Sequence, residues 1–159
     1  MMKNRAAITG IGIFCAAGKD VPAFTENLFA GRSAIGPVDL FDVSRCPARI
    51  GAQVRDYEPL DYFDARSVSR LSRADQFGLI AAGEALRGSG VRDCYSPYDI
   101  GVSMGAGASG MYHAELWLSR TLAGERARPS LLRGILPDRT ATDIALRYDL
   151  AGYQGSIMT

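Results

Sequence analysis

Histidine and cysteine are scarce in this chain, which has one histidine and three cysteines among its 159 residues. Cys15, Cys46 and Cys94 are odd in number and show no metal-ligand spacing, so neither a disulfide framework nor a zinc site is predicted. His113 has no second histidine to work with, and we expect it at the surface or at an interface. The cysteine pattern favours reduced thiols and a cytoplasmic protein.

The chain also lacks a long apolar run and an excess of one charge. No stretch approaches the roughly 20 apolar residues that a membrane span needs, and the N-terminus is too short and glycine-broken for a signal peptide. The net charge of +1 provides no global field that would favour nucleic acid or an anionic membrane. With 47% hydrophobic and 22% charged residues, the composition is that of one globular domain.

Strand and helix patterns alternate along the sequence. Apolar runs predict strands over residues 6–14 and 100–104, with a short third strand within 49–54. The stretch from 32 to 61 is otherwise predicted to be irregular, because glycine and proline interrupt it repeatedly. Helical patterns occupy residues 65–86, 111–122 and 139–148. The alternation predicts an α/β fold.

A further helix is predicted between Asp20 and Gly31, where start and stop signals are clear. Asp20 is a suitable N-cap, Pro22 falls in the first turn, and Gly31 stands where a C-cap glycine is expected. The apolar residues at helical spacing predict one buried stripe, formed by Val21, Phe24, Leu28 and Phe29.

The last residues, 153–159, have the pattern of a buried strand. A domain that finished in a core strand would leave an unpaired edge and lose packing. We therefore expect the polypeptide that belongs after Thr159 to be either an omitted segment or a separate chain, and the open strand edge favours a complementary chain. A segment of this kind on its own is expected to aggregate.

Two glycine patterns raise the question of nucleotide binding. Gly105, Gly107 and Gly110 have the spacing of a dinucleotide-binding turn between a strand and a helix. The acidic residue that should follow a second strand is not evident, so a tight strand-to-helix turn is favoured. Residues 9–12 have an incomplete version of the pattern, which favours a close-packed bend. A Rossmann-type nucleotide binder stays as an alternative that predicts stabilisation by NAD.

Taken together and in order, several segments resemble the condensing enzymes, the β-ketoacyl-(acyl-carrier-protein) synthases of fatty-acid and polyketide assembly. The resemblance covers nearly the whole chain and is specific as a set, although each segment alone is loose. The segments are Ile8-Thr9-Gly10-Ile11-Gly12, Glu26-Asn27-Leu28, residues 30–37, Phe41-Asp42, residues 70–77 and 81–86, and Gly101-Val102-Ser103-Met104-Gly105-Ala106-Gly107.

The resemblance implies a thiolase-like layered α-β-α-β-α architecture, of which residues 1–159 form most of the N-terminal half. It implies decarboxylative Claisen condensation of an acyl thioester with malonyl-carrier protein, with no metal or nucleotide cofactor. The register places the nucleophilic cysteine just after Thr159 and the catalytic histidines and lysine much later. No catalytic residue is therefore assigned within the chain, and Cys15 is expected to be a small packed residue.

Two groups of residues are candidates for function through the resemblance. Gly107 and Ala108 match the turn beside the acyl tunnel, where elongating members often carry a bulkier apolar residue than alanine. A small side chain at position 108 would widen the tunnel, whereas the plainer interpretation is a helix start that needs a small residue.

Arginines on the predicted long helix form the second group. Arg66, Arg70 and Arg73 have the i, i+4 and i+7 spacing of one helical face, and the first two match basic positions that contact the acidic carrier protein in the family. A solvated basic face is the alternative. The implied partners are thus an acyl carrier protein, the remainder of the synthase and a second subunit in a homo- or heterodimer.

Several departures from the family pattern leave a second function open. Ala16, Thr25, Tyr153 and the pair Asp138-Arg139 differ from the usual residues. They indicate a divergent subfamily, such as a polyketide or specialised-lipid synthase. The alternative is a non-catalytic subunit of the chain-length-factor kind, in which the nucleophilic cysteine is replaced.

Overall fold

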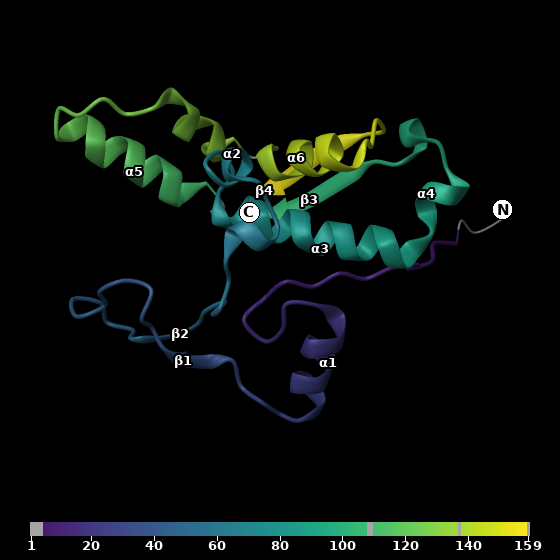
Figure 1. Ribbon diagram of the computed structural model, residues 1–159, viewed down its shortest axis with the longest axis horizontal. Helices are drawn as coiled ribbons and strands as arrows, with labels where there is room; N and C mark the ends of the chain where they lie inside the picture. Colours follow the sequence, from purple (N-terminus) through teal and green to yellow (C-terminus); the bar gives the residue numbers. More distant parts are fainter. Residues whose placement is uncertain (1–4, 108–109, 137, 159) are drawn as a thin grey trace.

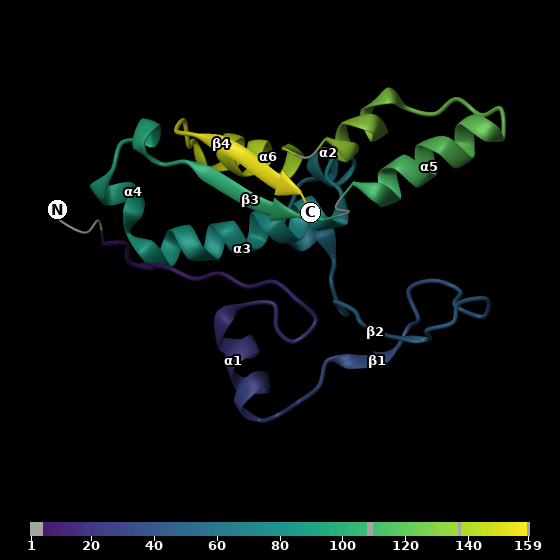
Figure 2. The ribbon, with the colours of Figure 1, turned by 180° about the vertical axis from the view of Figure 1, so that it is seen from behind.

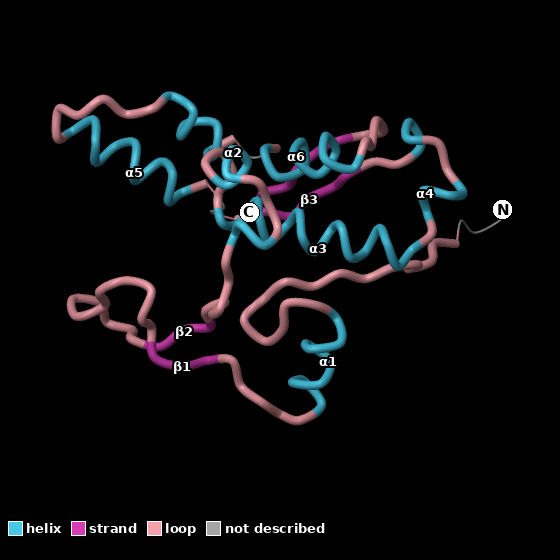
Figure 3. The backbone as a smooth tube through the Cα atoms, in the orientation of Figure 1, coloured by secondary structure: helices cyan, strands magenta, loops and turns pink. Residues whose placement is uncertain are grey.

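The computed structural model describes residues 5–107, 110–136 and 138–158. Helices predominate and the strands are short (Figure 3). In chain order the elements are α1 (Val21–Phe29), β1 (Ile35–Pro37), β2 (Ile50–Ala52), η1 (Pro59–Asp61), α2 (Ala65–Val68), α3 (Arg73–Ser89), α4 (Val91–Cys94), η2 (Pro97–Asp99), β3 (Val102–Ala106), α5 (Met111–Leu122), η3 (Pro129–Ile135), α6 (Arg139–Tyr148) and β4 (Gln154–Met158).

The centre of the structure is a parallel pair of strands covered by two helices. β3 and β4 pair in parallel, with Val102 opposite Gln154 and Ala106 opposite Met158. Helix α6 packs on both strands and α3 packs beside α6 (Figures 1 and 2). The predicted α/β fold and the presence of a terminal strand are therefore confirmed. The burial predicted for that strand is wrong, because Ile157 within it is 69% exposed. The buried apolar side chains between these elements are Phe63, Leu71, Leu79, Val102, Ala141, Ile144, Ala145 and Leu150.

The helix predicted over residues 65–86 is wrong in its first part, because the chain forms two helices there. α2 ends at Val68 and α3 begins at Arg73. Ser72 has extended backbone angles and forms a capping box with Asp75, in which each side chain accepts from the other residue's backbone N–H. A new helix start of this kind satisfies N–H groups that a continuous helix would have bonded internally.

The strand predicted over residues 6–14 is not formed, since no strand within residues 5–107, 110–136 and 138–158 pairs with it. The segment runs along α3 (Figure 1). The backbone N–H of Ile13 donates to Glu84 Oε2 at 2.9 Å, and that of Val21 donates to Oε1 at 2.8 Å. Gly10 and Gly12 permit the approach, because a Cβ on either would overlap a backbone carbonyl of α3. A pattern of apolar residues identified an extended segment but not its partner.

Helix α1 begins and ends as predicted, although its apolar stripe is only partly covered. The Asp20 carboxylate accepts from the backbone N–H of Ala23 at 2.7 Å, and Gly31 adopts a positive φ of 64° just after the helix. Leu28 and Phe29 are exposed by 60% and 86%, so their predicted burial is wrong. The reason is that no element in the described part of the chain packs on that flank of α1.

The remaining elements form two projections from this centre. β1 and β2 pair antiparallel as a short hairpin, which includes the predicted strand within 49–54 and places β1 in a stretch predicted to be irregular. α5 and η3 pack together as a helical arm that extends from the end of β3 (Figures 1 and 2). The predicted helices 111–122 and 139–148 are confirmed. Across the described residues, no helix has the length and apolar content that a membrane crossing requires.

Candidate functional site

The carboxyl ends of β3 and β4 meet at one edge, which is the candidate site. Parallel strands that end together are where α/β proteins commonly place ligands. β3 leads into Gly107, where the backbone bends. No atom of the described residues lies within 4 Å of a Cβ built on Gly105 or Gly107, so both border open space in the described part of the chain. Ala108, the second residue predicted to line the acyl tunnel, lies outside the described residues.

A glycine pair ties the start of α5 to η3 beside this edge. Gly110 is buried, and a Cβ there would collide with the backbone carbonyl of Gly134. His113 lies on the same side of α5 against Gly134, and its Nδ1 is buried with no hydrogen-bond partner among the described residues. The third glycine of the dinucleotide-like pattern thus serves helix packing, which supports the strand-to-helix turn over a phosphate-binding loop.

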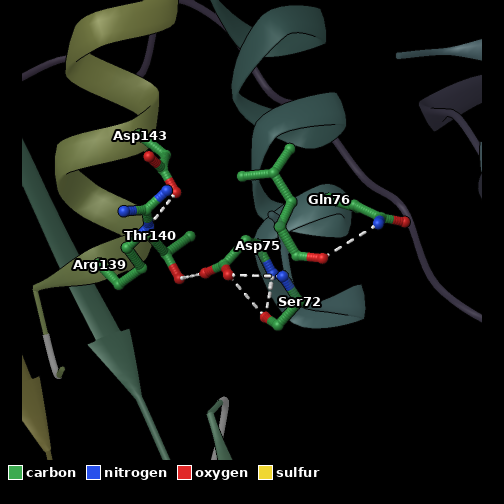
Figure 4. A network of polar contacts seen from close by, with 7 residues as sticks. Ser72, Asp75, Gln76, Arg139, Thr140 and Asp143 are labelled. Atoms are coloured by element: carbon green, nitrogen blue, oxygen red, sulfur yellow. Dashed lines mark hydrogen bonds and ion pairs between the residues drawn. The ribbon is translucent and has the colours of Figure 1, made fainter. Parts of the chain in front are cut away.

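Beneath this edge, a buried polar network joins α3 to α6 (Figure 4). Asp75, which is 2% exposed, accepts hydrogen bonds from the Ser72 backbone N–H and hydroxyl at 2.9 and 2.7 Å and from the Thr140 hydroxyl at 2.6 Å. Gln76 Nε2 donates to the Leu71 carbonyl at 3.3 Å. The Ser-x-x-Asp spacing could have revealed the cap, whereas nothing in the sequence joins Asp75 to a threonine 65 residues later.

An ion pair on α6 lies beside this network (Figure 4). Arg139 Nε donates to Asp143 Oδ2 at 2.6 Å, and the two side chains are 13% and 11% exposed. Burial raises the pKa of Asp143 above its usual value, and the positive charge of Arg139 offsets this in part. Arg139 differs from the residue usual in the condensing enzymes that the sequence resembles, but its pair with Asp143 was not predicted.

The three arginines predicted to share one helical face belong to different elements. Arg66 lies in α2, Arg70 in the turn that follows it, and Arg73 is the first residue of α3, so the single face is wrong. All three are exposed. Among the described residues, neither Arg66 nor Arg70 forms an ion pair with a carboxylate.

Arg73 is already engaged within the chain. Its Nη2 donates to the Val54 carbonyl at 2.7 Å, and its guanidinium lies 5.1 Å from the ring centroids of both Tyr57 and Phe77. Burial raises the pKa of Tyr57 to about 12, and its hydroxyl donates to Gln76 at 2.6 Å. This cluster holds the loop before α2 against α3.

The cysteines show no sign of a nucleophilic site. Cys15 closes a tight turn with Gly18 and is half-buried at a cavity of about 510 Å³ between the N-terminal loop, α1 and the β1–β2 hairpin. Cys46 and Cys94 lie apart from it in the sequence, and Cys94 is exposed. Within the described ranges, no group of three or more potential ligands is placed to hold a metal ion.

Comparison with known proteins identifies the relatives of this chain. A family model described as the N-terminal domain of β-ketoacyl synthases matches residues 3–159. The chain is 31% identical, over its whole length, to a 3-oxoacyl-[acyl-carrier-protein] synthase 2 of Coxiella burnetii. It is 35% identical, over 99% of its length, to a putative polyketide β-ketoacyl synthase 1 of Streptomyces cyaneus. It spans 39% of the length of each of these relatives.

The fold has relatives among solved structures as well. The chain superimposes on the ishigamide ketosynthase/chain length factor with a TM-score of 0.77 and 25% sequence identity. The match covers 96% of this chain and 39% of that one. The arrangement of strands and helices is thus that of the N-terminal half of a thiolase-like ketosynthase fold.

Proposed function

The chain belongs to the β-ketoacyl synthase family, whose N-terminal domain it matches, and from that premise we propose that it forms part of a 3-oxoacyl-(acyl-carrier-protein) synthase. The reaction is decarboxylative Claisen condensation of an acyl thioester with malonyl-carrier protein, in fatty-acid or polyketide synthesis. The observation that carries the proposal is similarity over the whole chain to the 3-oxoacyl-[acyl-carrier-protein] synthase 2.

We propose that the nucleophilic cysteine follows β4, at the edge where β3 ends. The parallel register supports this, because it brings the polypeptide leaving β4 alongside Gly107, and the space around that glycine is open. In the reaction a cysteine thiolate would attack the acyl thioester and release the carrier thiol. Malonyl-carrier would lose CO2, and its carbanion would attack the acyl-enzyme to give the 3-oxoacyl-carrier and free thiolate. No metal or nucleotide cofactor is needed.

The test is product formation by the full-length protein. It is incubated with an acyl primer and malonyl-carrier protein, and the carrier is analysed by mass spectrometry. We expect 3-oxoacyl-carrier protein together with released CO2. If a protein that melts cooperatively formed neither 3-oxoacyl-carrier protein nor CO2, the enzyme assignment would be wrong.

Ala108 remains a proposed wall of the acyl tunnel, together with Gly107. If the small side chain sets the width of the tunnel, Ala108→Ile shortens the longest acyl primer that the synthase extends. The measurement is the relative kcat/KM for primers of increasing length, with total activity on the shortest primer as the control. An unchanged chain-length preference would leave Ala108 with a packing role.

For the partner, we propose that an acyl carrier protein docks on the exposed surface of α2 and the turn after it. Arg66 and Arg70 present positive charge there, and carriers of acyl chains are acidic. Replacing both by Glu should raise the apparent KM for carrier substrate on the order of tenfold, because it replaces attraction by repulsion. Arg73 lies at the border of this surface and is held by its stacking on Tyr57 and Phe77.

A KM unaffected by the double charge reversal would place the carrier elsewhere. The matched control is Arg92→Glu on α4, where an exposed arginine lies near the opposite end of α3. We expect this variant to keep the wild-type KM.

A second candidate function is a silent partner subunit that shapes the pocket of an active ketosynthase. The similarity to the ishigamide ketosynthase/chain length factor supports this second candidate. The residue at the nucleophile position distinguishes the two, since a cysteine predicts acyl transfer and a glutamine predicts none without a partner. With either function, we propose a dimeric assembly in the cytoplasm.

A further inference from the structure

A cavity of about 290 Å³ opens between α2, α3 and α6. Its charged lining consists of three guanidinium groups, those of Arg70, Arg139 and Arg147, and one carboxylate, that of Asp143. The arginines come from the turn after α2 and from the two ends of α6. Three cations that converge from separate elements on a concavity with one compensating anion favour an anionic occupant.

Arg139 is the most buried of the three arginines, since Arg70 and Arg147 are both exposed. Its side chain is 13% exposed, and Nε is taken by Asp143. The two terminal amino groups donate no hydrogen bond to any described residue. Because Arg139 lines the cavity, these amino groups remain available there. A guanidinium with both terminal nitrogens available matches the geometry of a carboxylate.

Arg147 is held in place at the same cavity. Its guanidinium lies 5.0 Å from the ring centroid of Phe63, and Nη2 donates to the Tyr62 carbonyl at 3.4 Å. Arg70 also lines the cavity, and in the described ranges neither of these two arginines has a carboxylate partner. A stacked guanidinium loses less conformational entropy on binding than a free one does.

We propose that this three-arginine pocket receives an acidic side chain of the docked carrier protein. The inference rests on the proposed function and deepens it, because it assigns residues of α6 to the docking surface. Arg70 belongs to both the pocket and the exposed basic surface of α2, so the two are continuous. An Asp or Glu side chain of a protein docked on α2 therefore reaches the pocket without a separate site. The pocket fixes how the carrier is oriented, and the exposed arginines attract it.

The experiment compares carrier affinity and carrier specificity in three variants of the full-length protein. Arg147→Gln removes one positive charge from the pocket. Arg139→Lys keeps a positive charge to pair with Asp143 but removes the guanidinium that could bind a carboxylate through two nitrogens. Arg92→Gln on α4 is the matched control. The readouts are the dissociation constant of the carrier, which requires no turnover, and the ratio of kcat/KM for carrier-linked over pantetheine-linked acyl thioester.

We expect the first two variants to weaken carrier binding and to lower the specificity ratio about three- to tenfold, since each removes one charged contact. We expect the control to match the wild type. Carrier affinity and ratio unchanged in both pocket variants, with melting temperatures retained, would overturn the proposal. A wild type that binds carrier through the pocket yet condenses neither substrate would instead count against the proposed function alone.

A small anion is the competing occupant. Inorganic phosphate is therefore titrated at constant ionic strength, and we expect it to weaken carrier binding by the wild type more than by Arg147→Gln. If phosphate bound the pocket while the carrier constants were unaffected by either variant, the pocket would be a phosphate site and carrier docking there would be excluded.

Discussion

At the scale of single residues, two carboxylates that each accept several hydrogen bonds join distant segments of the chain. Asp75 joins two helix starts that lie 65 residues apart in sequence, and the hydrogen bonds that its carboxylate accepts come from Ser72 and Thr140. Glu84 acts similarly for the N-terminal segment, since its two oxygens accept from Ile13 and Val21. A charged acceptor with several donors is stabilising, whereas its removal would leave buried donors unsatisfied.

The raised pKa of Asp143 should make the stability of the protein depend on pH in the acidic range. Burial raises its pKa above the usual 3.8, so the folded state keeps this proton to higher pH than the unfolded state does. The contribution of Asp143 to the free energy of unfolding therefore falls as pH rises from its unfolded pKa through its raised folded pKa. Above the folded pKa the contribution stays low. The Asp143→Asn variant lacks this dependence.

The measurement is the free energy of unfolding of wild type and Asp143→Asn across the acidic range. We expect the variant to gain on the wild type as pH rises through that window and the difference to level off above it. A difference between the two proteins that is independent of pH would show that the folded pKa of Asp143 is not raised.

At the scale of elements, contact between the N-terminal segment and α3 depends on glycines without side chains. Gly12 lies where a Cβ would overlap the Ala81 carbonyl and come within 2.7 Å of the Ala85 backbone nitrogen. Gly12→Ala should therefore destabilise the protein by about 3 kcal/mol, because the segment must move off the helix.

The matched control lies on α3 itself. Gly88 has no atom within 4 Å of a built Cβ, so Gly88→Ala should be neutral or stabilising by up to about 1 kcal/mol through helix propensity. Urea denaturation of both variants is the measurement. Equal effects of the two substitutions would show that close packing at Gly12 does not hold the segment in place.

Local patterns predicted the elements whose signals are local. The helices over 111–122 and 139–148, the cap at Asp20 and the left-handed Gly31 all follow from spacing and capping chemistry, and the structure confirms them. The break before α3 was missed because apolar periodicity continues across it, although the Ser72-x-x-Asp75 box was readable. The strand over 6–14 was wrong because a strand depends on a partner that no local pattern specifies.

The candidate site was predictable to the same extent. The Gly105–Gly107 turn and the terminal strand came from the sequence, but their parallel register came from tertiary pairing. The pocket formed by Arg70, Arg139 and Arg147 could not be predicted, because its arginines meet only when α6 packs against α3. Sequence spacing suggested Arg73 as a companion of Arg66 and Arg70, and its guanidinium instead stacks on Tyr57 and Phe77.

At the scale of the whole molecule, apolar side chains are buried between α3, α6 and the strands but are exposed on the N-terminal segment and α1. Ile8, Ile11, Leu28 and Phe29 are all more than half exposed, on the segment along α3 and on α1. The chain spans 39% of its first two curated relatives. We therefore propose condensing activity for the full-length protein, with this chain contributing one edge of the proposed site.

We propose that the acyl group is carried on the residue that follows β4, beside Gly107. The direct test is to incubate the full-length protein with acyl-carrier protein alone, digest it, and map the acyl adduct by mass spectrometry. We predict a single thioester on a cysteine immediately following β4. An adduct on Cys15, Cys46 or Cys94, or a stable full-length protein with a cysteine at that position and no adduct, would contradict the account.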